Sequence, residues 1–267
     1  MKKLFVFDID DTILPRGDKH IPLSTVKSIN ELLKNGNAIC LASGRPYTGI
    51  KQYLDEFCNG EKYAIVANGA GLYTYDGKLI SEKFMTPKEV YYLYDHYGHL
   101  PTTSVYAYDN ASGMITFTDD KWTRHEFDVN KIQNHIEFDK KDYRNSNIKI
   151  YKTMIASESE ISRNIALTKE EFKKFHPTRS TVNFYEILIK GASKLERIED
   201  LVKYLNINEN DVYTFGDNNN DSEMIEHYNG TALGNAIDEC KKVAKHVTID
   251  VKDDGVTYAL KNILKVL

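Results

Sequence analysis

The amino-acid sequence predicts an α/β protein whose core is a parallel sheet and whose middle section is a separate α+β insertion. Short, wholly apolar runs at 4–7, 38–42 and 64–67 alternate with stretches of helical periodicity, a pattern typical of a parallel sheet with crossover helices. Near residue 83 the pattern changes to alternating, tyrosine-rich segments, and near residue 193 the first pattern returns.

The first half of the predicted core alternates strands with helices. Residues 4–7 are uniformly apolar, as expected for a strand that is buried on both faces. Helical spacing of apolar residues is followed by Gly36, which suits the end of a helix, and Asp76-Gly77 predicts a hairpin turn. The predicted helices and the hairpin lie at 24–35, 47–57 and 73–79.

The middle of the chain is predicted to form an α+β domain, because its alternation of apolar and polar residues is typical of half-buried antiparallel strands. Alternating stretches lie at 103–108, 114–118 and 148–155, and helical patterns lie at 87–96 and 158–175. The core resumes with a helix at 194–205 and a strand at 212–215. We therefore expect a core domain of residues 1–82 and 188–267 and an inserted domain of residues 83–187.

The composition limits the class of protein. The 267 residues carry a formal net charge of −4, whereas a general nucleic-acid binder normally has a basic surplus. The three cysteines are far apart and odd in number, which favours reduced thiols in the cytoplasm. No apolar stretch has the length of a signal peptide or a membrane span. We expect a cytoplasmic monomer or weak dimer with no nucleic-acid or membrane partner.

Three carboxylates, Asp8, Asp10 and Asp11, follow the first predicted strand. In open α/β sheets, ligands bind beyond the carboxyl ends of the strands. Because alternate residues of a strand point the same way, we expect Asp8 and Asp10 to face one site. Two like charges ~4 Å apart repel by about 4 kcal/mol at an effective dielectric near 20, so this pair needs a proton or a cation. Taken alone, the pattern also suits a helix cap or a turn.

Polar groups recur where other predicted strands end or helices begin. They are Ser43, Lys194, Asp217, Asn220 and Asp221. Phosphoryl transfer needs a nucleophile, a metal ion, a cation and hydrogen-bond donors around the phosphoryl group. An aspartate can be that nucleophile, through an acyl-phosphate, and Mg²⁺ prefers oxygen ligands. The set therefore predicts a phosphoryl-transfer site.

Taken in order, these residues resemble the four motifs of the haloacid dehalogenase superfamily. The motifs are Asp8-Ile-Asp10-Asp-Thr12, Ser43-Gly-Arg-Pro, Lys194 and Gly216-Asp217-Asn-Asn-Asn220-Asp221. Landmarks similar to those of its Cof-like phosphatase branch are Asn68-Gly69-Ala70, Leu233-Gly234-Asn235-Ala236 and Asp254-Gly255-Val256. The motifs cover both halves of the core and leave the insertion without a signature. The resemblance implies a Rossmann-like catalytic core with an inserted α+β cap.

The resemblance also implies a role for each carboxylate. Asp8 would attack phosphorus in line. Asp10 would protonate the leaving oxygen and later deprotonate the hydrolytic water, so it must be protonated part of the time. Mg²⁺ would bind the Asp8 carboxylate, the Asp10 main-chain carbonyl and the Asp217 carboxylate. Asp221 would orient a metal-bound water or Lys194.

The remaining residues would hold the phosphate, again by resemblance. Ser43 and the neighbouring backbone N–H of Gly44 would bind phosphate oxygens at a helix N-terminus. Lys194 would balance their charge as a point donor, and Asn220 would donate to the phosphoryl group. For Arg45 two interpretations stay open, an ion pair within the protein and a contact to the substrate.

The sequence departs from the family pattern at two positions. Asp11 stands where the family usually has glycine, and because aspartate tolerates unusual backbone angles better than most residues, we expect the turn to persist. Leu195 follows Lys194 where glycine is frequent, while Lys190 and Gly191 lie just upstream. Lys190 is therefore the alternative for the lysine that faces the phosphate.

These inferences predict a Mg²⁺-dependent phosphatase that hydrolyses small phosphorylated metabolites through an aspartyl-phosphate on Asp8. By resemblance, the expected substrates are sugar phosphates, followed by nucleotide phosphates and cofactor phosphates such as pyridoxal phosphate or flavin mononucleotide. Two alternatives stay open: a phosphomutase, which passes the phosphoryl group to a second hydroxyl, and a noncatalytic sensor of a phosphorylated ligand. The inserted domain is expected to act as a lid that selects the substrate.

Overall fold

A computed structural model describes residues 1–111, 113–130, 132 and 134–267. The chain divides into two compact units, one formed by Met1–Glu82 with Ser193–Leu267 and the other by Lys83–Ala192. The second crossing between units falls a few residues beyond the expected boundary at 187. The reason is that strand β11 (Phe184–Ile189) pairs within the sheet of the second unit as far as Ile189.

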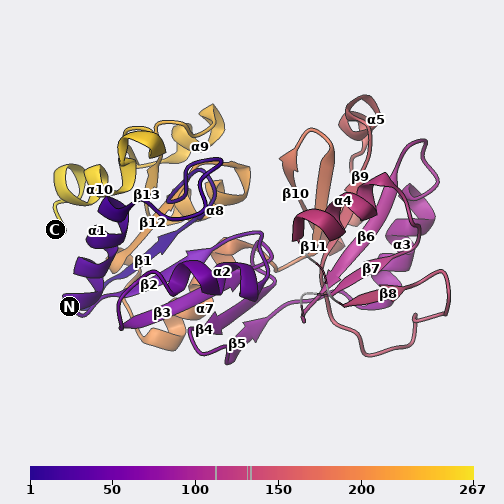
Figure 1. Ribbon diagram of the computed structural model, residues 1–267, viewed down its shortest axis with the longest axis horizontal. Helices are drawn as coiled ribbons and strands as arrows, with labels where there is room; N and C mark the ends of the chain where they lie inside the picture. The colour runs from indigo at the N-terminus through magenta and orange to yellow at the C-terminus, as the bar shows by residue number, and fades with distance from the viewer. Residues whose placement is uncertain (112, 131, 133) are drawn as a thin grey trace. The chain divides into compact units, whose positions relative to one another are not determined.

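The first unit is built on an eight-stranded sheet in the order β14-β13-β12-β1-β2-β3-β4-β5 (Figure 1). The strands are β1 (Leu4–Phe7), β2 (Ala38–Ala42), β3 (Glu61–Val66), β4 (Gly71–Thr74), β5 (Leu79–Glu82), β12 (Val212–Gly216), β13 (Asn229–Ala232) and β14 (His246–Val247). All neighbours are parallel except β3–β4 and β4–β5, which are antiparallel. The α/β class and the predicted hairpin are therefore confirmed.

Strand β1 occupies the interior of this sheet, between β12 and β2. All four of its side chains are fully buried, which explains its uninterrupted apolar sequence. Leu4 and Val6 pack on one face with apolar residues of helices α7 (Lys194–Leu205), α8 (Asn219–His227) and α9 (Asp238–Val243). Because both neighbours of β1 are parallel to it, the residues after all three strands emerge at the same edge.

Further helices complete the first unit: α1 (Leu23–Lys34), α2 (Tyr47–Leu54) and α10 (Gly255–Tyr258), with the short helices η1 (Glu209–Asp211), η2 (Val251–Asp253) and η3 (Ala259–Ile263). Helix α1 contacts β2 and α10, and α2 contacts β3. The predicted helix at 47–57 is real but ends at Leu54. None of the helices in the described part of the chain combines the length and the apolar character needed to cross a bilayer.

The second unit contains a six-stranded sheet in the order β10-β11-β9-β6-β7-β8 (Figure 1). Its remaining strands are β6 (Ser104–Asp109), β7 (Met114–Thr116), β8 (His135–Glu137), β9 (Ile150–Ala156) and β10 (Phe175–Thr181), and its helices are α3 (Pro87–Tyr97), α4 (Lys121–Asn130), α5 (Ser159–Asn164) and α6 (Glu171–Lys174). All strand pairs except β7–β8 are antiparallel, as the alternating sequence predicts.

The continuous helix predicted at 158–175 is wrong. The structure has the short helices α5 and α6 with a non-helical link, and β10 begins at Phe175. The guanidinium of Arg179 donates to the carbonyls of Ser162 and Ile165, where α5 ends. Thr168 and Glu171 then exchange backbone-to-side-chain hydrogen bonds in the pattern of a capping box, which starts a new helix. Helix α4 was not predicted, although Asp120 caps it by accepting from the N–H groups of Trp122 and Thr123.

Candidate active site

Asp8 and Asp10, which follow β1, lie in different environments. Asp8 is buried, and its N–H continues the ladder by donating to the Phe215 carbonyl at 3.0 Å. The chain then turns at Asp11, whose φ of +60° is the left-handed conformation that we expected aspartate to tolerate. Asp10 lies just before this turn, and its side chain is 54% exposed. One carboxylate is thus fixed inside the protein, and the other is open to solvent.

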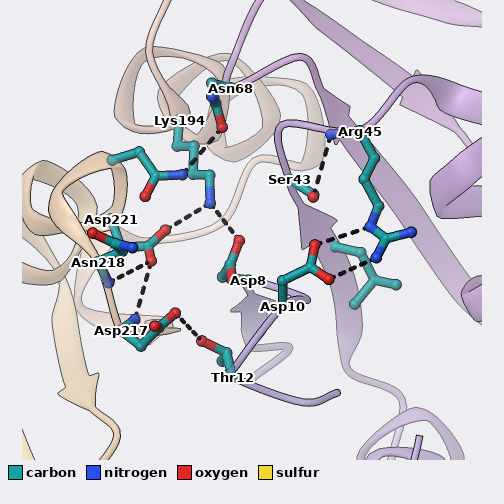
Figure 2. Close-up of polar contacts among 12 residues, drawn as sticks. Asp8, Asp10, Thr12, Ser43, Arg45, Asn68, Lys194, Asp217, Asn218 and Asp221 are labelled. Atoms are coloured by element: carbon teal, nitrogen blue, oxygen red, sulfur yellow. Dashed lines mark hydrogen bonds and ion pairs between the residues drawn. The ribbon is translucent and has the colours of Figure 1, made fainter. Parts of the chain in front are cut away.

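Asp217 and Asp221 come from the neighbouring strand and the helix after it. Asp217 follows β12 directly, and its Oδ1 accepts a hydrogen bond from the Thr12 hydroxyl at 3.1 Å. Asp221 lies in the first turn of α8, where its Oδ2 accepts from the N–H groups of Asp217 (3.0 Å) and Asn218 (3.2 Å) (Figure 2). This capping box fixes the Asp221 carboxylate and the main chain that carries Asp217.

Lys194 joins the two carboxylate-bearing segments. It is the first residue of α7, after the N-cap Ser193, and its side chain is 1% exposed. Its Nζ lies 2.6 Å from Oδ1 of Asp8 and 2.6 Å from Oδ1 of Asp221 (Figure 2). Lys190, the alternative, belongs to the second unit and has an exposed side chain. The lysine at the carboxylates is therefore Lys194.

The buried cluster holds more negative than positive groups. One oxygen each of Asp8, Asp217 and Asp221 lie within 4.8 Å of one another, with Lys194 as the ammonium that contacts two of them. Burial, followed by repulsion from Asp221, raises the pKa of Asp217 to about 7. Burial likewise raises the pKa of Asp8, against the attraction of Lys194. Burial lowers the pKa of Lys194, but the attraction of Asp221 and Asp8 outweighs it, so the lysine stays charged.

An oxygen-ligated divalent cation fits this cluster. Carboxylate oxygens are the donors that hard cations such as Mg²⁺ prefer, and a cation would offset both the burial and the repulsion that raise the pKa values of Asp8 and Asp217. The fit is best at Asp8 and Asp217. Both oxygens of Asp221 already accept hydrogen bonds from Lys194 and from backbone N–H groups.

The loop after β2 carries Ser43, Gly44 and Arg45. Ser43 is buried, its N–H donates to the Ile65 carbonyl at 2.9 Å, and its Oγ accepts from the Arg45 N–H at 3.3 Å. Helix α2 begins only at Tyr47, after the N-cap Pro46, so Ser43 precedes the helix N-terminus. A phosphate at this loop would therefore meet the Ser43 hydroxyl and the loop backbone before the helix end.

Arg45 pairs with Asp10. Its Nε donates to Oδ2 at 2.9 Å and its Nη2 donates to Oδ1 at 2.6 Å, which makes the pair bidentate (Figure 2). The hydrogen bonds to Asp10 raise the pKa of Arg45 above its ordinary value, and burial opposes this with a smaller effect. Of the two interpretations of Arg45, the structure has the ion pair. The two parallel hydrogen bonds from the forked guanidinium fix the orientation of the Asp10 carboxyl.

Asn220 and two residues without an assigned role also lie at this edge. The Asn220 side chain, on α8, donates to Oδ1 of Asn68 at 3.1 Å. Asn235 donates to the Asp11 carbonyl at 2.8 Å and accepts from the Val251 N–H at 2.9 Å. Asn68 and Asn235 were visible in the sequence as landmarks after predicted strands, but their partners are distant in the chain and carry no local pattern.

Comparisons with known proteins identify the family. The sequence model of the haloacid dehalogenase-like hydrolases matches residues 5–260. A Bacillus subtilis (strain 168) protein named "Putative phosphatase YxeH" is 33% identical, covering 99% of both chains, and a similarly named protein of Haemophilus influenzae is 30% identical, covering 98% of both. The solved structure of the subclass IIB sugar phosphatase BT4131 superposes with a TM-score of 0.80 at 20% identity, covering 99% of this chain and 100% of that one.

The family covers both segments of the first unit and the second unit between them. The resemblance drawn from the ordered motifs is thereby confirmed, and so is the hydrolase fold. This chain belongs to the haloacid dehalogenase-like hydrolase family and is an enzyme of its phosphatase type.

Proposed function

We propose that this enzyme is a Mg²⁺-dependent phosphatase of small phosphate monoesters, with Asp8 as the nucleophile. The observation that carries the proposal is the arrangement of Lys194, whose ammonium touches Asp8 and Asp221 within a buried, net negative cluster. A purely structural ion pair has no need of the additional carboxylate of Asp217. A site for a cation and a phosphoryl group does need it, because the cation requires its own ligands.

In the first step, an oxygen of the Asp8 carboxylate forms a bond to phosphorus while the ester bond to the leaving oxygen breaks. Asp10 gives the leaving oxygen its proton. In the second step, Asp10 takes a proton from water, the water oxygen bonds to phosphorus, and the bond to Asp8 breaks. The fork of Arg45 supports this role, because it holds Asp10 in one orientation while leaving more than half of its side chain exposed.

Mg²⁺ would be held by the carboxylates of Asp8 and Asp217 and by the Asp10 carbonyl. When bound, it would neutralise charge on the phosphate oxygens. Lys194 would add a fixed positive charge beside the same oxygens, and Asp221 would keep that lysine in place. The Ser43 hydroxyl, the loop backbone near Gly44 and the Asn220 amide would donate to the phosphoryl group.

We propose sugar phosphates as the substrate class, supported by the fold shared with a solved sugar phosphatase. We further propose that the inserted domain acts as a lid and selects the leaving group. The core residues above are suited to a phosphate and a cation, and few of them are suited to a sugar. Closure of a lid would also exclude water, which strengthens charge interactions. The free state of Cys40, Cys58 and Cys240 supports a cytoplasmic location.

The test is a screen of phosphorylated metabolites with Mg²⁺ in which released inorganic phosphate and isomerised product are both measured. Phosphate release is expected for sugar phosphates, and EDTA should abolish it. An isomer formed without phosphate release would indicate a mutase, and no turnover with any ester would indicate a sensor. Replacing 83–192 with a short linker should remove the preference for sugar phosphates over an aryl phosphate. An unchanged preference in a folded variant would assign selection to the core.

A further inference from the structure

The turn that follows β3 has an unusual backbone. Ala67, Asn68 and Gly69 have φ values of +48°, +57° and +105°, so three successive residues are left-handed. Glycine adopts this conformation routinely, and asparagine and aspartate adopt it occasionally, at a lower energetic cost than other non-glycine residues. A run of three persists only where the surrounding structure holds it in place. The contacts of this turn show what holds it.

The backbone of the turn is bonded to the loop that carries Ser43. The Asn68 N–H donates to the Ser43 carbonyl at 2.9 Å, and the Ala67 N–H donates to the Arg45 carbonyl at 3.0 Å. The Asn68 side chain, itself buried, lies against Gly44, where an added Cβ would be 3.2 Å from the side-chain amide of Asn68. The turn therefore fixes the path of the loop on both sides of Gly44.

The same turn reaches the residues at the starts of α7 and α8. A Cβ at Gly69 would lie 2.1 Å from the carbonyl carbon of Ser193 and 2.7 Å from the N atom of Lys194, so only glycine permits this approach. Oδ1 of Asn68 accepts from the Asn220 side-chain amide at 3.1 Å. Asn68 thus lies between the loop of Gly44 and the side chain of Asn220, and it contacts both.

The bond to Asn68 determines how Asn220 is aimed. A side-chain amide has two N–H groups, and when one of them donates to Asn68 the plane and the direction of the second are set. Without the acceptor, the Asn220 amide would rotate among its rotamers and lose that orientation. The side chain of Asn68 has the geometry of a positioning group, since its acceptor oxygen is engaged by Asn220.

We propose that Asn68 is a positioning residue, whose side chain aims the Asn220 amide at the phosphoryl group, while its backbone N–H, which Asn68→Gly keeps, holds the Ser43–Arg45 loop. The inference rests on the proposed function, because it assigns Asn220 to the phosphoryl group. It goes beyond that function in naming a residue that acts through another and in requiring energetic coupling between the two asparagines.

A double-mutant cycle tests this coupling. Asn68→Gly removes the side chain and keeps a residue that tolerates the left-handed backbone. We expect kcat/KM for p-nitrophenyl phosphate to fall about 10- to 100-fold, the usual cost of losing a supporting hydrogen-bond partner. If Asn68 acts through Asn220, the variant that combines Asn68→Gly with Asn220→Ala should be within twofold of Asn220→Ala alone. If the fold-loss in kcat/KM of the double variant equals the product of the two single fold-losses, the proposal is overturned.

The matched control is Asn206→Gly, the same substitution at another left-handed asparagine (φ +52°), at the far end of α7 from Lys194. Asn206→Gly should leave kcat/KM within twofold of the wild type. The melting temperature of Asn68→Gly should be similar to that of Asn206→Gly. If Asn68→Gly does not fold, Asn68→Ala replaces it, because alanine lacks the acceptor oxygen and the neighbouring Ala67 already has a left-handed backbone (φ +48°). In that background Asn220→Ala should change kcat/KM by no more than twofold, and a cost equal to that in the wild type would overturn the coupling.

A second readout separates this inference from the proposed function. Affinity for inorganic phosphate in the presence of Mg²⁺, measured by calorimetry, needs no turnover. If the wild type binds phosphate but hydrolyses no ester, the proposed function fails, while the cycle measured on phosphate affinity still decides the coupling. Affinity that Asn68→Gly leaves unchanged, or a wild type that binds no phosphate, would overturn the inference.

Discussion

The two units of this enzyme bury charge in different ways. In the second unit, one lysine and one glutamate form a buried pair, with Nζ of Lys152 2.9 Å from Oε2 of Glu186 and exposed fractions of 11% and 5%. In the first unit, the carboxylates of Asp8, Asp217 and Asp221 share the single ammonium of Lys194. A matched pair largely offsets its own desolvation. In the unmatched cluster, burial and then repulsion between the carboxylates raise the pKa values of Asp8 and Asp217, and Lys194 does not fully oppose this.

The difference teaches how to distinguish a structural charge from a functional one. Burial alone does not do so, because both groups are buried. The sign of the imbalance does, because a persistent negative excess is tolerated only where a ligand offsets it or where protons are bound. The predictions below test this comparison, from the largest expected effect to the smallest.

Asp8→Asn should abolish turnover, by at least about a thousandfold, because a neutral amide cannot attack phosphorus. The fold should persist, since the substitution removes one of the repelling carboxylates and Lys194 keeps its contact with Asp221. Steady-state phosphate release and thermal unfolding are the measurements. Asp18→Asn, at an exposed position, is the control and should be fully active. Substantial activity in Asp8→Asn would exclude Asp8 as the nucleophile.

Lys194→Met should lower kcat/KM by about 10²–10³, the usual cost of losing one charge-stabilising donor in a desolvated site. It should also lower the free energy of unfolding by about 3–5 kcal/mol at neutral pH, because it leaves buried carboxylates without their cation. Lys190→Met, at an exposed position of the second unit, should change neither quantity appreciably. The opposite order of effects on kcat/KM would assign the phosphate-facing role to Lys190.

The stability that Asp217 contributes to the metal-free enzyme should decrease as pH rises from about 4 to about 7. The folded-state pKa of Asp217 is about 7, above the ~3.9 of an unfolded aspartate, so in this window the folded state binds more protons. The stability contributed by that proton is fully present below pH ~4 and is lost by pH ~7, at most about 4 kcal/mol. The measurement is the difference in unfolding free energy between wild type and Asp217→Asn.

Mg²⁺ should reverse this loss, with its largest stabilising effect at the upper end of the window, where the carboxylates are ionised. The same titration with saturating Mg²⁺ checks this, and Asp217→Asn should respond less. A wild-type difference that grows with pH in the metal-free protein would contradict both the sign of the imbalance and the comparison between the units.

The smallest effect is expected in the second unit. Replacing the matched pair with Lys152→Met and Glu186→Met together should change the free energy of unfolding by no more than about 1 kcal/mol, or stabilise the protein, whereas either single substitution should cost about 3 kcal/mol. Denaturant unfolding of the three variants measures this. A double variant as unstable as the singles would show that this pair, too, requires its charges.

Much of the core could be predicted from sequence because its signals are local. The wholly buried strands β1 and β2 read as uninterrupted apolar runs, and polar residues follow each of them directly. Asp8 and Asp217 were expected at one site because parallel strand ends meet at one edge, and Lys194 was expected there because the ordered motifs resemble those of the family. The pairing of Arg45 with Asp10 was left open, since both an internal partner and a substrate satisfy the same guanidinium.

The errors arise where contacts distant in sequence decide the local structure. The helical pattern of 158–175 is interrupted because Arg179, on a later strand, takes the carbonyls that a longer helix would have used. The importance of Asn68 is likewise invisible locally, because its partner Asn220 is 152 residues away. Propensity describes neighbours along the chain, and tertiary hydrogen bonds can override it.

The position of β1 has a consequence for synthesis. Strand β1 is synthesised well before its neighbour β12 and before Lys194, the partner of Asp8, which lies 186 residues later in the sequence. The hydrogen bond from Asn235 that holds the turn at Asp11 is encoded later still. A nascent chain therefore has Asp8 long before it has the ammonium of Lys194, and the contact between them forms only after Lys194 has been synthesised. Contacts of such long sequence separation also predict slow folding of this unit.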